Sequence, residues 1–85
     1  MSLTQLRYFV AVAREGSVSR AAKKCFVSQP PMSRQVRALE DELRVTLFER
    51  HTRGMRLSRE GRRVLAQSER ILAMVDELGA PPNKV

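Results

Sequence analysis

The sequence contains a single cysteine, a single histidine and no tryptophan. One thiol cannot build a disulfide framework, and Cys25 and His51 alone cannot supply the paired ligands of a zinc site. The sequence also has no glycine-rich phosphate loop and no convincing pair of catalytic carboxylates. These absences argue against an enzyme, and we expect no metal, no cofactor and no small-molecule site.

Long hydrophobic runs are missing as well. No stretch approaches the ~20 consecutive apolar residues that a membrane-spanning helix needs. The first residues, MSLTQLR, also lack the basic and apolar segments of a signal peptide. We therefore expect a cytoplasmic protein with no membrane partner.

Acidic residues are the third shortage. The 85-residue chain has 16 Lys and Arg against 9 Asp and Glu, which gives a net charge of +7. Residues 1–58 hold eleven basic and five acidic side chains, whereas residues 59–85 hold five and four. A basic excess concentrated in one part of the chain indicates a polyanionic partner, either nucleic acid or an anionic membrane surface.

The apolar residues that are present repeat mostly with helical spacing. Residues 3–15, 18–25 and about 30–43 each place apolar side chains on one face. Residues 47–57 instead form two short runs around a glycine-containing loop, which indicates a hairpin. The predicted fold is all-α with a small β-hairpin wing. It consists of a winged helix-turn-helix in residues 1–58, with the helix-turn-helix motif at about 18–37, and a long C-terminal helix.

That long helix is expected over residues 59–78, and it serves as a linker and dimerisation helix in this interpretation. It carries two neighbouring apolar stripes, and a helix with two apolar stripes needs two partners. One stripe serves the chain's own core, and the other indicates a second copy of the chain. The stripe assigned to the dimer interface consists of Val64, Ser68, Ile71, Val75 and Leu78. Residues 79–85 contain two prolines and are typical of a hinge or linker.

The third helix begins near two adjacent prolines and changes charge along its length. A residue before proline is disfavoured in helical geometry, so Gln29 is predicted to be an extended N-cap and Pro30 the first helical residue. Arg34 and Arg37 lie in the front half, whereas residues 40–42 are all acidic. The front half can therefore enter an anionic groove, and the rear half cannot comfortably do so.

Several side chains near this front half suit nucleic acid. Glutamine and arginine match the edges of adenine and guanine in the major groove, which favours DNA contacts for Gln29 and Arg34. Arg37 has two interpretations of equal weight, a phosphate contact or an ion pair with Asp41. Arg53, at the tip of the wing, suits a narrow A·T-rich minor groove. Further phosphate contacts are expected from Ser17, Lys23, Ser28 and Arg50.

These segments resemble the DNA-binding region of LysR-type transcriptional regulators. The resemblance covers about residues 3–78 and rests on the paired alanines, on SQPPMSRQVRALE and on LFERHTR. It implies a bacterial, nucleoid-associated homodimer that binds an interrupted palindrome in double-stranded DNA to regulate transcription. Higher oligomers and an effector-binding domain after the linker would belong to a full-length regulator. The resemblance assigns base contacts to Gln29, Pro30, Ser33 and Arg34, and the minor-groove contact to Arg53.

Three residues depart from the pattern of that family. Arg44 stands where the family usually has glycine, and in a left-handed conformation its side chain would cost on the order of 1 kcal/mol. Val18 and Cys25 are smaller than the frequent Phe and Leu. We expect the space they leave to be compensated by Phe26 or to remain loosely packed.

Two other classes of function stay open from the residues themselves. The chain could be a dimerising protein-interaction module whose basic surface is incidental. It could also bind nucleoid DNA or RNA without specificity. The basic front half of the third helix argues against the first alternative. Binding without a preferred site would favour the second, because phosphate contacts carry no sequence information.

Overall fold

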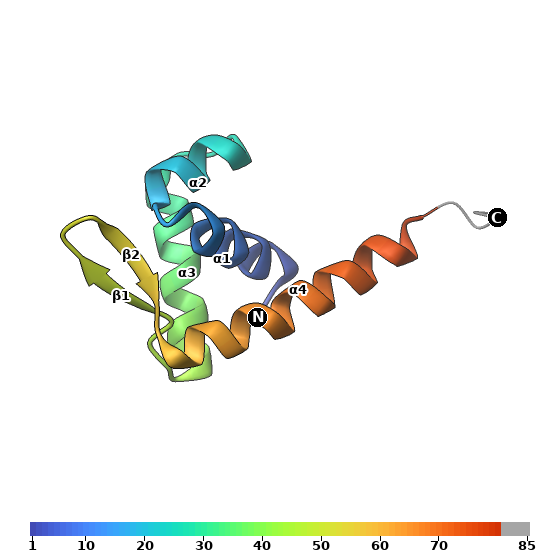
Figure 1. The fold of residues 1–85 in the computed structure, drawn as a ribbon. Helices are drawn as coiled ribbons and strands as arrows, with labels where there is room; N and C mark the ends of the chain where they lie inside the picture. The colour runs from blue at the N-terminus through green and yellow to red at the C-terminus, as the bar shows by residue number, and fades with distance from the viewer. Residues whose placement is uncertain (81–85) are drawn as a thin grey trace.

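The computed structural model describes residues 1–80, and the residues expected to form most of the linker, 81–85, lie outside this range. The chain forms four helices and one antiparallel hairpin, so the predicted fold class is confirmed (Figure 1). The elements in chain order are α1 (Leu3–Glu15), α2 (Val18–Cys25), α3 (Gln29–Leu43), β1 (Phe48–His51), β2 (Gly54–Leu57) and α4 (Arg59–Leu78).

Local signals in the sequence explain where the first two helices begin and end. Ser2 and Gln5 form a complete capping box at the start of α1, and Gly16 ends α1 with a left-handed φ of 67°. The Ser17 hydroxyl then accepts a hydrogen bond from the Arg20 amide at the start of α2. Only Gly16 and Ser17 lie between α1 and α2. So short a connection restricts the direction of α2 relative to α1.

The core lies between α1, α3 and the first strand, and α2 closes it. Phe9, Met32, Leu39 and Leu47 are among its fully buried side chains. Phe9 and Phe48 meet edge to face with ring centroids 5.4 Å apart, a geometry worth about 0.5–1.5 kcal/mol beyond the buried area. This ring pair packs α1 against the first strand of the wing.

The start of α3 differs from the sequence prediction by one residue. Ser28 is the N-cap, with an extended φ of −81° and ψ of 163°, and Gln29 is already helical. The restriction that proline places on its predecessor disfavours helical geometry without forbidding it. Pro30 and Pro31 then occupy the second and third helical positions. Because these positions normally donate to the N-cap side chain and proline has no N–H, Ser28 makes no capping hydrogen bond.

Two non-glycine residues adopt left-handed conformations at helix ends. Arg44 does so after α3, with φ of 58°, so the condition under which its side chain costs free energy is met. Phe26 does so after α2, with φ of 59°. The Phe26 side chain is 93% exposed, so the expectation that it compensates for the smaller Val18 and Cys25 is wrong. A left-handed C-cap points this ring away from the core.

The two faces of α4 are arranged differently from the sequence prediction. Val64 and Ser68 are buried within the chain's own core, with Ser68 only 1% exposed, and so they offer no surface to a second copy. The buried face of α4 takes residues from both predicted stripes, since Leu72 of the other stripe is buried beside Val64 and Ser68. The large apolar side chains left exposed on this helix are Ile71, Met74 and Leu78. The last turns of α4 project away from the other helices (Figure 1).

Candidate nucleic-acid interface

The basic side chains divide into two groups according to their partners. On α1 and α2, four of the five cations face acids; Arg7 lies 3.5 Å from Asp76, and Arg14 lies 2.8 Å from Glu69. The arginines of α4 have no ion pair within residues 1–80. On α3 and the wing, no arginine forms an ion pair with any residue of the described chain. These unpaired cations are Arg34, Arg37, Arg50, Arg53 and Arg56, and all five are exposed.

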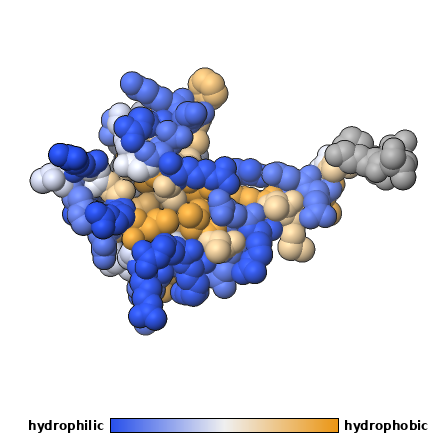
Figure 2. Space-filling view, in the orientation of Figure 1, coloured by the Kyte–Doolittle hydropathy of each residue, from blue (hydrophilic) through white to orange (hydrophobic). Residues whose placement is uncertain are grey.

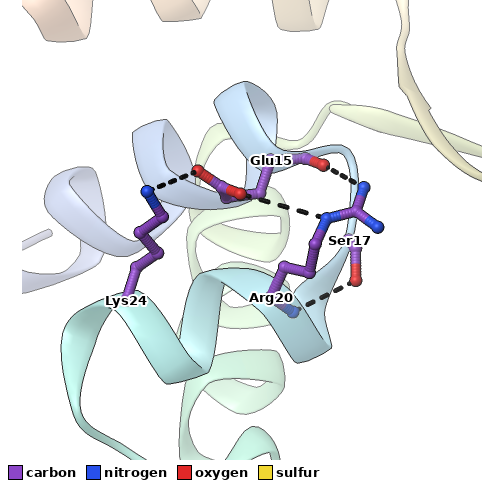
Figure 3. A network of polar contacts seen from close by, with 4 residues as sticks. All are labelled: Glu15, Ser17, Arg20 and Lys24. Atoms are coloured by element: carbon purple, nitrogen blue, oxygen red, sulfur yellow. Dashed lines mark hydrogen bonds and ion pairs between the residues drawn. The ribbon is translucent and has the colours of Figure 1, made fainter.

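The loop between α1 and α2 shows how the acids neutralise cations outside the candidate site (Figure 3). Both carboxylate oxygens of Glu15 face a cation, Arg20 Nε at 3.9 Å and Lys24 Nζ at 3.9 Å. The Arg20 guanidinium also donates a 2.6 Å hydrogen bond to the Glu15 carbonyl oxygen. Lys23, on the same helix, is exposed and has no ion pair within residues 1–80. Lys23 therefore remains available to an external anion.

The predicted base-reading residues lie together at the front of α3. Gln29, Pro30, Ser33 and Arg34 are all exposed, and they occupy the first two turns of the helix. The opposite face of the same turns is anchored by Met32, which is fully buried. The helix therefore presents a fixed polar surface rather than a flexible loop.

A groove between α3 and the wing joins two parts of the predicted site. Its volume is about 310 Å³, and its lining includes Ser33 and Arg37 from α3 and Arg50 from β1. Arg37 forms no ion pair with Asp41, so one of its two interpretations is not realised in the structure. The groove thus combines the two guanidinium groups with the hydroxyls of Ser33 and Thr46 and the carboxylate of Glu40.

The wing carries Arg53 in its turn, between strands paired in a simple antiparallel register. Phe48 pairs with Leu57, and His51 pairs with Gly54. Arg53 lies in the two-residue turn and is exposed. Gly54, with φ of 129°, lies so close to the loop between α1 and α2 that an added Cβ would approach the Gly16 carbonyl oxygen to 2.8 Å. The base of the tip is therefore held against the helical body.

One functional candidate was missed by sequence reasoning. The half-buried Glu40 accepts hydrogen bonds through Oε2 from the backbone amides of Leu47, at 2.8 Å, and Phe48, at 3.4 Å. From the sequence, Glu40 is one of three consecutive acids that keep the rear of α3 away from an anion. No periodicity or charge pattern signals a carboxylate that bonds to backbone amides seven and eight residues later.

Within residues 1–80 the structure contains no group of three His, Cys, Asp or Glu residues placed to hold a metal ion. In the same part of the chain, every helix is too short or too polar to cross a bilayer.

Residues 3–62 match the family model described as bacterial regulatory helix-turn-helix protein, lysR family. The chain belongs to the LysR family. The LysR-type regulator ClcR of Pseudomonas putida is 46% identical over 76 residues, which is 89% of this chain and 26% of ClcR. The probable cat1 operon transcriptional activator of Acinetobacter lwoffii is 42% identical over 85 residues, 100% of this chain and 28% of that protein. This chain therefore spans only about a quarter of these relatives.

Solved LysR-family structures agree with the fold. The DNA-binding domain of CbnR, in complex with DNA, has a TM-score of 0.89 at 46% identity, covering 93% of this chain and 91% of that one. The BenM domain in complex with catB site 1 DNA has a TM-score of 0.89 at 42% identity, covering 92% and 88%. The named relatives are transcriptional regulators rather than enzymes. The resemblance predicted from the sequence motifs is confirmed.

Proposed function

We propose that this chain is the DNA-binding domain of a LysR-type transcriptional regulator and binds double-stranded DNA sequence-specifically. The observation that carries the proposal is the partition of charge: arginines on α3 and the wing lack acidic partners, whereas Arg7, Arg14, Arg20 and Lys24 have them. The DNA complexes of the CbnR and BenM domains, which share this fold at 42–46% identity, support the same conclusion.

In this proposal the front of α3 enters the major groove. Arg34 and Gln29 read base edges, and Pro30 and Ser33 contact the neighbouring bases. The exposed Ser28 hydroxyl can donate a hydrogen bond to a phosphate. The remaining phosphate contacts are assigned to Ser17, Lys23, Arg37 and Arg50. Arg53 enters the adjacent minor groove from the wing.

Selection of bound duplexes from a random pool tests this proposal. Arg34→Ala is expected to lower the ratio of specific to nonspecific affinity, since a good base contact is worth about 1–3 kcal/mol of discrimination. Arg37→Ala is the matched control on the same helix. It should weaken all duplexes alike and reduce the slope of log K against log salt by about 0.9. Equal loss on all duplexes for Arg34→Ala would contradict base reading, and enrichment of no site would favour nonspecific binding.

We further propose that α4 pairs two copies of the chain. Ile71, Met74 and Leu78 form an exposed apolar surface on its outer turns, with Val75 half-buried beside them. In Figure 2 an apolar area lies between α1 and α4 and is bordered by hydrophilic side chains over α2 and the wing. A second copy is the occupant that fits, because the long helix is complementary to itself in charge.

That complementarity also favours one orientation. Residues 59–66 hold three arginines and one glutamate, a net +2, whereas residues 67–78 hold three acids and one arginine, a net −2. Antiparallel pairing places each basic half beside the acidic half of the other copy. Sedimentation at tens of micromolar should detect a dimer that Ile71→Asp dissociates, whereas Ala66→Asp, on the exposed polar face, should leave it intact. A monomeric wild type would reject this part of the proposal and leave DNA binding to be judged separately.

In terms of organisation, we propose that residues 1–58 form the binding unit and residues 59–78 the linker and dimerisation helix. Residues 79–85 would then lead toward an effector-binding domain of a longer regulator. The lengths of ClcR and its relatives support this division, because they extend well beyond the matched region.

A further inference from the structure

The hairpin of the wing depends on the rest of the chain for its orientation. An isolated two-stranded hairpin is marginally stable in water, and residues 1–80 add no third strand to this one. Its direction relative to α3 must therefore come from contacts with the rest of the chain. Three hydrogen bonds on two sides of the hairpin contribute to this direction.

On the α4 side, residues 46 and 47 are held by the N-cap of the last helix. The Ser58 hydroxyl donates to the Thr46 carbonyl oxygen, and the Ser58 amide donates to the Leu47 carbonyl oxygen at 2.9 Å. Gly61 allows this approach, because an added Cβ would lie only 2.2 Å from the Leu47 oxygen. On the side of the α1–α2 loop, the Met55 amide donates to the Gly16 carbonyl oxygen at 3.3 Å.

On the α3 side, the contact is made by a side chain. Glu40 lies in the last turns of α3, and its Oε2 accepts from the amides of Leu47 and Phe48, where β1 begins. A carboxylate forms stronger hydrogen bonds with amides than a neutral acceptor does. Glu40 thus joins the base-reading helix directly to the strand that leads to the wing tip.

The position of this carboxylate is unusual for a DNA-binding face. Glu40 lines the same groove as Arg37 and Arg50 but forms an ion pair with neither of them. A negative charge in that groove repels phosphate, so charge alone would favour its removal. Its two hydrogen bonds to backbone amides offset this repulsion, because they hold the first strand of the wing against α3.

We propose that Glu40 is a positioning residue that fixes the angle between α3 and the wing, so that Arg53 reaches the minor groove while α3 occupies the major groove. The inference rests on the proposed DNA-binding function and assigns Glu40 no contact with DNA. Neutralising Glu40 should have two opposite effects. The loss of a negative charge should strengthen nonspecific attraction to DNA, and the loss of the correct wing angle should weaken base readout by Arg53.

The test compares two duplexes that share a selected site and differ in A·T-rich or G·C-rich sequence under the wing. Affinities at fixed salt are measured for the full chain, Glu40→Gln, Arg53→Ala and the double variant. We expect Glu40→Gln to lower the A·T preference by about fivefold to tenfold, the scale of one lost groove contact. It should add nothing further once Arg53 is alanine, because both changes act through the wing. The charge-matched control, Asp41→Asn, should keep the preference.

Amide hydrogen exchange supplies a readout that does not depend on DNA. Glu40→Gln should raise exchange rates in β1 and β2 by about tenfold or more and leave those of α1 unchanged. An unchanged A·T preference, an equal effect in the Arg53→Ala background, or uniform exchange across the chain would each overturn the positioning role. Failure of the wild type to prefer either duplex would count against the wing contact of the proposed function, and the exchange rates would still judge Glu40.

Discussion

Replacing Arg44 by glycine should stabilise the fold, although arginine is the better helix former. Arg44 ends α3 with φ of 58° and ψ of 40°, a left-handed conformation. For a residue with a Cβ this costs about 1–2 kcal/mol. Glycine removes that cost. The greater conformational freedom of glycine in the unfolded chain destabilises the fold by about 0.4–1 kcal/mol, which offsets part of the gain. The matched reference is Arg44→Ala, which removes the charge and keeps the strained Cβ.

We therefore expect Arg44→Gly to be about 0.5–1 kcal/mol more stable than Arg44→Ala. At about 2.1 cal/mol/K of unfolding entropy per residue, this corresponds to a Tm about 3–6 °C higher. Thermal unfolding followed by far-UV circular dichroism at pH 7 measures the difference, with all variants at one concentration because dimerisation alters Tm. The exposed Arg44 side chain has no ion pair within residues 1–80 that would complicate the comparison. Equal Tm values for the two variants would show that the left-handed conformation carries no strain here.

Three further changes test the packing. Phe26→Gly should raise Tm above Phe26→Ala by about 3–6 °C, since the backbone of residue 26 is left-handed; an equal or lower Tm would mean that a Cβ carries no strain in that conformation. Gly61→Ala should lower urea stability by more than about 1 kcal/mol, because the new methyl meets the Leu47 carbonyl oxygen; an unchanged midpoint would contradict that close approach. Phe9→Ala should cost about 3–5 kcal/mol by the same measurement, and a loss below about 1 kcal/mol would refute its place at the centre of the core.

The sequence was most informative where one residue acts through its own neighbours. Helical periodicity and the caps at Ser2, Ser17 and Ser58 depend on residues within one turn, and the structure has all three caps. The start of α3 was placed one residue late, because two local preferences compete there. Serine is a preferred N-cap, which favours Ser28 as the cap and Gln29 as the first helical residue. The proline after Gln29 disfavours helical geometry at Gln29, and the sequence does not show which preference is stronger.

The other omissions concern contacts between distant segments. Val64 and Ser68 carry the same spacing as the exposed Ile71, and only the position of α1 makes the first two internal. Glu40 looked like a solvated acid because its partners, the amides of residues 47 and 48, belong to another element. Such contacts arise from the tertiary arrangement, so the pattern of residue types along the chain does not encode them locally.

The distribution of acids explains why a net charge of +7 produces a localised site. Six of the nine acids lie against a partner: Glu15, Glu42, Glu49, Glu69 and Asp76 face cationic or titratable groups, and Glu40 holds backbone amides. Exposed pairs of this kind contribute at most about 1 kcal/mol each to stability, so stability is a weak reason for their placement. Their larger effect is on the electrostatic field, because they neutralise four of the five cations on α1 and α2 and leave the arginines of α3, the wing and α4 uncompensated within residues 1–80. The reversal of charge along α3 matches this distribution. At its acidic end, Glu40 accepts from backbone amides and Glu42 pairs with the N-terminal amine, whereas the arginines at its basic end are exposed and unpaired within residues 1–80.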